Sequence, residues 1–140
     1  MVELDEMRVG DNEITLNDNL VKTSILPQTS KELSRNVKVQ NNVTFESAVF
    51  GNNINVEGGN VAFEGAVYAA TELHINSDVT GDIVFKKAVA SADSIVALMT
   101  SQRVIFGSDI NASGVRLKNC YVGGSVFGSE VYLENCVVLG

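Results

Sequence analysis

Small or apolar residues recur along this chain in pairs separated by a single residue, and towards the C-terminus these triplets follow one another at short, regular steps. An inward–outward–inward triplet has the period of a β-strand, and about two or three further residues are enough to turn a corner. The steps run six, five, five and then six, five, five, from triplets that begin at Val104, Ile110, Val115, Cys120, Val126, Val131 and Cys136. The pattern therefore predicts coils made of three short strands and three corners.

The sequence itself also repeats with the period of one coil. The stretch from Val115 to Val122 (VRLKNCYV) returns sixteen residues later from Val131 to Val138 (VYLENCVV). A self-similar period of this kind indicates a solenoid, in which each repeat buries its apolar side by stacking on the next. We expect an all-β, single-stranded parallel β-helix of triangular cross-section, with about 16–17 residues per coil and about six coils.

Towards the N-terminus the same register continues with more drift. Its triplets begin at Val37, Val43, Val49, Ile54, Val61, Val67, Leu73, Val79, Ile83 and Ala88. Residues 91–101 fit it least well. One interpretation is a strand with Ile95 and Met99 inward; the other is a short helix capped by Ser91 or Asp93. The pattern leaves both open.

Two parts of the chain differ in composition. Residues 36–140 carry the triplets and form the predicted β-helix domain, whereas residues 1–35 are more acidic and form an N-terminal segment or cap that packs on the rod. Most of the twelve glycines fall at predicted corners, where Gly and Asn supply positive φ angles. Asn119 and Asn135 lie one period apart, so we expect their amides to stack as a ladder along an edge.

The charge balance restricts the partners. With 17 acidic and 10 basic residues the net charge is −7, which repels nucleic acid and anionic lipid, so nucleic-acid and membrane partners are not expected. The N-terminus has neither the positive start nor the apolar run of a secretory signal, and no stretch is long enough for a transmembrane helix. These features predict a cytoplasmic protein.

Candidate catalytic chemistry is sparse. Cys120 and Cys136 occupy equivalent positions in adjacent coils, and we interpret them as reduced core thiols rather than as a disulfide or a metal site. His74 is the only histidine and faces outward in the predicted register. No phosphate-binding loop, nucleophile elbow or paired-carboxylate motif is present. The sequence therefore predicts neither an enzyme nor a cofactor.

The exposed apolar positions are more informative. On one predicted face the outward residues of four successive coils align as a stripe of Val89, Ile105, Tyr121 and Val137. Such a stripe needs a cover, either another protein or the N-terminal segment of this chain.

The last predicted coil is a second apolar surface. The sequence stops at Leu139-Gly140 directly after a regular triplet, so this coil would expose unpaired backbone groups above an apolar triangle, which is a template for another copy. We place self-association at Val131, Leu133, Val138 and Leu139.

The rungs of residues 37–140 resemble those of the bactofilins, a family of bacterial and archaeal cytoskeletal proteins. The resemblance rests on Val-x-Gly and Val-x-Ala rungs at five- or six-residue steps, as at Val49-Phe-Gly-Asn, Val67-Tyr-Ala-Ala and Val122-Gly-Gly-Ser-Val. It implies a short right-handed triangular β-helix that polymerises without nucleotide, by head-to-head and tail-to-tail stacking of its terminal coils. Bactofilins usually carry flexible, proline-containing tails, sometimes with an N-terminal membrane-binding stretch, and the acidic N-terminus here departs from that pattern.

Together these features predict a non-enzymatic, self-associating cytoskeletal or scaffold protein whose partner is another copy of itself. The alternative is a trimeric acyltransferase on a left-handed β-helix of the hexapeptide-repeat type, with His74 as the general base between subunits. Strict six-residue steps are typical of left-handed coils, so the mixed steps favour the first hypothesis.

Overall fold

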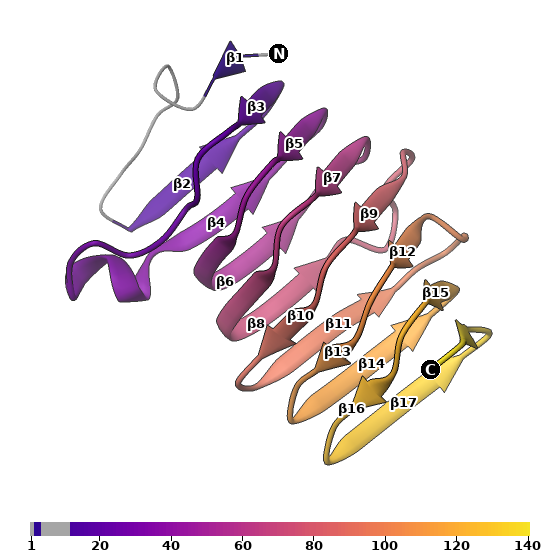
Figure 1. Cartoon of the computed structure of the whole chain (residues 1–140). Coiled ribbons are helices and arrows are strands. Elements are labelled where there is room, and N and C mark those ends of the chain that lie inside the picture. The colour runs from indigo at the N-terminus through magenta and orange to yellow at the C-terminus, as the bar shows by residue number, and fades with distance from the viewer. Residues whose placement is uncertain (1, 4–11) are drawn as a thin grey trace.

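The computed structural model describes residues 2–3 and 12–140, and these residues form a stack of β-strand coils (Figure 1). All strand pairs among them are parallel, and they build a β-solenoid of about six turns, which confirms the predicted fold class. The helical content of this part of the chain is one short 3-10 helix, η2 (Lys31–Ser34). The chain advances through the stack in one direction, so its two ends lie at opposite ends of the rod (Figure 1).

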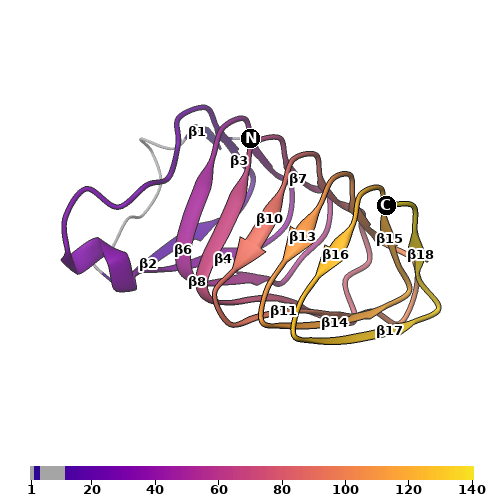
Figure 2. The same ribbon diagram turned by 60° about the horizontal axis from the view of Figure 1, so that its bottom comes forward.

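Successive strands along the chain lie on three faces in turn, which gives the predicted triangular section (Figure 2). The first face contains β1 (Val2–Glu3), β3 (Asn19–Val21), β5 (Val43–Phe45), β7 (Val61–Phe63), β9 (Ile83–Phe85), β12 (Val104–Phe106), β15 (Cys120–Val122) and β18 (Val137–Val138). The second face contains the first halves of β6 (Val49–Val56) and β8 (Val67–Ile75), followed by β10 (Val89–Ser91), β13 (Ile110–Asn111) and β16 (Val126–Phe127). The third face contains β2 (Glu13–Leu16), β4 (Asn36–Val39), the second halves of β6 and β8, β11 (Ser94–Leu98), β14 (Gly114–Lys118) and β17 (Glu130–Glu134).

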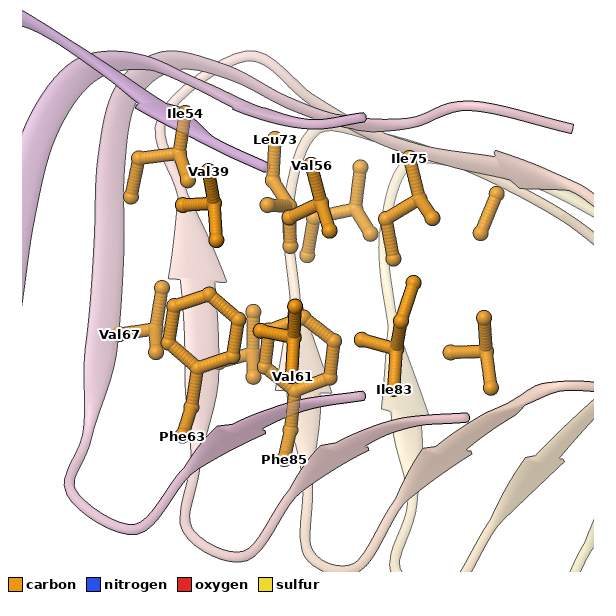
Figure 3. Packing of buried hydrophobic residues seen from close by; sticks show 14 of the residues in the cluster. Val39, Ile54, Val56, Val61, Phe63, Val67, Leu73, Ile75, Ile83 and Phe85 are labelled. Atoms are coloured by element: carbon orange, nitrogen blue, oxygen red, sulfur yellow. The ribbon is translucent and has the colours of Figure 1, made fainter. Parts of the chain in front are cut away.

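The core is a narrow column of side chains that point inward from all three faces (Figure 3). Its centre on the first face is a stack of four phenylalanine rings, Phe45, Phe63, Phe85 and Phe106. Neighbouring ring centroids are 4.6, 4.6 and 4.8 Å apart, with interplanar angles of 9°, 2° and 11°. This spacing matches the rise between stacked strands, so the fold itself sets the distance between the rings.

The register of the middle coils differs from the prediction in detail. Residues 94–98 form strand β11 and not a helix, and Ile95 and Met99 are buried, as the strand interpretation requires. The inward triplet of β10 begins at Val89, one residue later than Ala88. Strand alternation decides this point, because Val89 lies in register with the buried Val67 and Ile110.

Coil length is less uniform than the repeat suggests. Residues joined across adjacent coils are 16 apart for Asn119 and Asn135, but 18 apart for Asn42 and Asn60 and 22 apart for Glu64 and Lys86. From β4 onward most of the extra residues lie at the corner between the third and first faces. Residues 76–82 join β8 to β9 there and residues 99–103 join β11 to β12, whereas Asn119 alone joins β14 to β15.

At this corner the positive φ angles belong to five asparagine or aspartate residues and not to glycines. They are Asp18, Asn42, Asn60, Asn119 and Asn135, and no described glycine has a positive φ, so the role predicted for glycine is wrong. The Asn42 amide donates to Asp18 Oδ1 at 2.8 Å, and the Asn60 amide donates to Asn42 Oδ1 at 3.1 Å. The Asn135 amide donates to Asn119 Oδ1, which confirms the predicted ladder.

Several glycines are instead required where adjacent coils approach closely. A Cβ atom on Gly59 would lie 2.3 Å from Gly81 Cα, a distance that real Cβ atoms do not reach. The backbones of these two corners therefore pack directly on each other, which only glycine permits.

The stack begins before residue 36. Strand β2 pairs with β4 and β3 pairs with β5, so part of the predicted N-terminal segment is itself a coil. The connection from that coil to β4 contains η2, where Arg35 pairs with Glu32 at 3.2 Å. Strand β1 pairs with β3 and extends the first face by one strand at this end.

Candidate functional site: an open terminal coil and a lateral groove

The C-terminal coil exposes side chains that point towards the column axis. Val131 and Leu133 in β17 are 44% and 43% exposed, whereas their register partners one coil earlier, Val115 and Leu117, are fully buried. Val138 is half-buried against the core, and Leu139 is 64% exposed. The four residues predicted for self-association thus lie together at this end of the rod.

The backbone of this coil is open on the same side. Strands β16, β17 and β18 pair with β13, β14 and β15, and no described strand pairs with their opposite edges (Figure 2). Three strand edges therefore surround an exposed apolar triangle. Unpaired strand edges of this kind are templates for the addition of another strand.

The first face carries an outward apolar stripe, but not with the predicted membership. Ile105, Tyr121 and Val137 lie in register on β12, β15 and β18 and are 42%, 39% and 46% exposed. Val89 does not belong to it, because this residue lies on the second face and is buried. The residue in register one coil before Ile105 is Val84, which is half-buried. We define the stripe from here on as Val84, Ile105, Tyr121 and Val137.

Three residues of the stripe, Ile105, Tyr121 and Val137, form the floor of a groove of about 430 Å³. The wall towards the corner of the third face is polar and consists of Asp82, Gln102 and Arg103. The described residues of the N-terminal segment lie near the other end of the stack and do not line this groove (Figure 1). They therefore do not act as its cover.

An apolar hollow of about 260 Å³ lies on the second face. The Phe50 and Tyr68 rings stack across adjacent coils at 5.5 Å beside the exposed Leu26, and Ala48 and Ala66 line the space between them. Stacking of this kind stabilises the pair of coils on which it lies.

Near the open end the third face carries a polar cluster. The Tyr132 hydroxyl donates a hydrogen bond to Glu134, and Lys118 Nζ lies 3.3 Å from the same carboxylate. The Tyr132 hydrogen bond and the Lys118 charge lower the pKa of Glu134, and the hydrogen bond to Glu134 raises the pKa of Tyr132. The Arg116 guanidinium lies 5.9 Å from the centre of the Tyr132 ring. These contacts join the last two coils and leave Glu134 ionised at neutral pH.

His74 lies on the third face beside a hollow of about 390 Å³ that Ser77, Asp78 and Leu98 also line. Within the described part of the chain its imidazole makes no hydrogen bond or ion pair.

No group of three or more His, Cys, Asp or Glu side chains suited to a metal ion occurs among the described residues. None of the described helices is long and apolar enough to cross a membrane.

The two cysteines are free thiols at the open end of the column. Val104 and Cys120 are register partners, and Cys136 follows in the next coil. Burial, with a smaller contribution from the neighbouring Cys136, raises the pKa of Cys120 to about 12 from an ordinary value of 9.0. The neutral thiol is therefore the favoured form, and the stability that it contributes is present below about pH 9 and lost as the pH rises through 12.

We predict that N-ethylmaleimide at about pH 8 modifies Cys136 at least about a hundredfold faster than Cys120, because Cys120 is buried and almost never a thiolate at that pH. Mass spectrometry of the Cys120→Ser and Cys136→Ser variants measures each rate separately. Both thiols should react at similar rates in concentrated guanidinium chloride. Similar rates in the folded protein would show that Cys120 is not in the core.

Comparisons with known protein families, with curated proteins and with solved structures find no match to this chain.

Proposed function

We propose that this protein is a non-enzymatic structural protein that self-associates without nucleotide by stacking the C-terminal coils of two copies. One observation carries the proposal. Inward-pointing positions that are fully buried at Val115 and Leu117 are nearly half exposed at Val131 and Leu133, one coil later. A second copy placed on this coil would bury them as an internal coil buries its own.

Apolar burial and backbone pairing both favour this contact. Completely burying a valine or leucine side chain contributes about 1.5–3 kcal/mol, and Val131, Leu133 and Leu139 are each about half exposed or more. Three strand edges in the same plane gain backbone hydrogen bonds at the same time. In a contact between two C-terminal coils the facing edges run antiparallel, whereas the coils within the rod pair in parallel.

The proposed contact is symmetrical, because it joins two C-terminal coils. The two ends of the described rod differ, since strand β1 extends the first face at the N-terminal end, whereas no described strand extends β18. In a tail-to-tail pair the same residues lie on both sides of an isologous interface. The resemblance of residues 37–140 to bactofilin rungs supports the same arrangement, with a second contact at the N-terminal ends making a filament in the cytoplasm.

Negative-stain electron microscopy of the 140-residue chain at several concentrations, without nucleotide or metal, tests the proposal. We expect rods at least twice the length of one solenoid, which lengthen or become more numerous as the concentration rises. Sedimentation velocity over the same range should show the corresponding shift to larger species. Single rods of constant length at all concentrations would contradict end-to-end association.

The acyltransferase hypothesis depends on His74. The His74 imidazole has no hydrogen-bond partner within the described residues of one chain. No specific observation favours a second function, so we put forward the structural one alone.

A further inference from the structure

The corner between the third and first faces contains one interruption of its repeat. The residues directly before β3, β5, β7, β9, β12 and β15 form a column that runs Asp18, Asn42, Asn60, Asp82, Arg103 and Asn119. Asn135, whose amide donates to Asn119, continues this column in the last coil. Five of these residues have positive φ angles, and the two that do not are Asp82 and Arg103. The regular corner is therefore replaced in two adjacent coils by a pair of oppositely charged residues.

The same two coils carry the long corner loops, residues 76–82 and 99–103. In a repeat protein the regular coils supply the stability of the fold. A loop that departs from the repeat is therefore a place where residues that bind a partner can lie. The loop of residues 99–103 brings Gln102 and Arg103 to the edge of the groove beside Ile105, and the loop of residues 76–82 brings Asp82 there.

Arg103 is incompletely satisfied in this position. Its Nε atom is buried and has no hydrogen-bond acceptor among the described residues. No other buried side-chain nitrogen or oxygen of these residues lacks a hydrogen-bond partner. Its Nη1 atom lies 3.9 Å from Asp82 Oδ1, which is beyond hydrogen-bond distance. Asp82 is also the more exposed partner, with side-chain exposures of 73% for Asp82 and 41% for Arg103. A buried donor without an acceptor is costly, and the exposed part of the guanidinium, which Asp82 contacts only at ion-pair distance, is free to donate to an oxygen ligand.

The surroundings of that guanidinium define the rest of the ligand. The groove floor beside it is the part of the apolar stripe in which Ile105, Tyr121 and Val137 follow one another at about 4.8 Å per coil. Three rungs span about 10 Å, which is the length of about three residues of extended chain. A carboxylate at Arg103 with apolar side chains over the stripe matches both parts of the groove.

We propose that this groove binds an extended peptide segment of a partner protein, in which one acidic side chain pairs with Arg103 and the apolar stretch that follows it runs along Ile105, Tyr121 and Val137. The open shape of the groove suits a peptide laid across the coils. The net charge of −7 on this chain disfavours a strongly acidic partner, so a single carboxylate is expected. The site lies on the side of the rod and does not depend on the stacking of its ends.

Isothermal titration calorimetry with blocked tetrapeptides tests the proposal on the full chain. The probes are acetyl-Glu-Val-Phe-Val-amide and its glutamine counterpart, acetyl-Gln-Val-Phe-Val-amide. We expect the acidic peptide to bind about tenfold more tightly or better, as a charge-assisted hydrogen bond at a partly buried site would provide. Arg103→Gln should remove this difference, and Arg103→Lys should restore part of it, since lysine keeps the charge without the bidentate fork.

Arg116→Gln on the third face is the matched control and should preserve the full difference between the peptides. Ile105→Ser should weaken both peptides to a similar degree, because it removes the apolar floor but not the guanidinium. Circular dichroism of each variant identifies any that fails to fold. Equal binding of the two peptides to the wild type, or a difference that survives Arg103→Gln, would overturn the proposal. Tighter binding of acetyl-Val-Phe-Val with a free C-terminal carboxylate would overturn the assignment to an internal acidic residue.

Discussion

Replacing Phe63 with alanine is expected to lower the free energy of unfolding by about 3–5 kcal/mol. The Phe63 ring is fully buried and stacks on Phe45 and Phe85 at 4.6 Å on each side, so its removal opens a cavity in the centre of the column and breaks two ring contacts at once. Urea denaturation followed by circular dichroism measures the change. The protein concentration is kept low, because self-association would raise the apparent stability.

Phe127→Ala is the matched control for this experiment. Phe127 lies on β16 and points outward to solvent, so the same substitution there should cost less than about 1 kcal/mol. Phe63→Leu keeps most of the volume and should fall between the two. If Phe63→Ala and Phe127→Ala shifted the urea midpoint equally, the phenylalanine stack would not be the centre of the core.

The C-terminal third of the fold could be predicted residue by residue, because its corners are short and its coils have one length. Between β12 and β18 the register partners are 16 residues apart, and the sequence repeat shows this spacing directly. The terminal coil followed from that register. Val131 and Leu133 lie where the alternation of inward and outward residues placed them.

Farther towards the N-terminus the same reasoning failed for a definite reason. Counting sixteen residues back from Ile105 gives Val89, but the partner of Ile105 is Val84, because residues 99–103 lengthen that coil. A corner loop can take up extra residues without disturbing the strands on either side of it. Since both residues are valines next to apolar neighbours, local composition did not reveal the error.

The groove beside Arg103 could not be found from the sequence for a related reason. Asp82 and Arg103 stand out only when they are aligned with the asparagines of the corner column, and that alignment requires the lengths of the loops between them. The signal that could have revealed the site is the loss of Asn before the triplets at Ile83 and Val104. It becomes visible once each first-face strand has been placed.

Replacing Leu133 with aspartate is expected to abolish end-to-end association while leaving the rod folded. Leu133 has a neighbouring coil on one side only, so the folded chain tolerates a charge there, whereas the fully buried Leu117 one coil earlier would not. In a tail-to-tail pair each copy would bury one unpaired charge, which costs several kcal/mol per ion. The association constant should therefore fall by more than about a thousandfold, as measured by sedimentation velocity.

Two matched variants separate burial at the contact from general repulsion. Leu133→Lys reduces the net negative charge of the chain but buries a charge at the same place, so it should abolish association as completely as the aspartate does. Phe127→Asp adds the same negative charge to an outward position of the same coil and should retain most of the association. Loss of assembly with aspartate but not with lysine would indicate long-range repulsion and would place the contact elsewhere. Assemblies of unchanged size in both Leu133 variants would show that the C-terminal coil is not the surface through which copies stack.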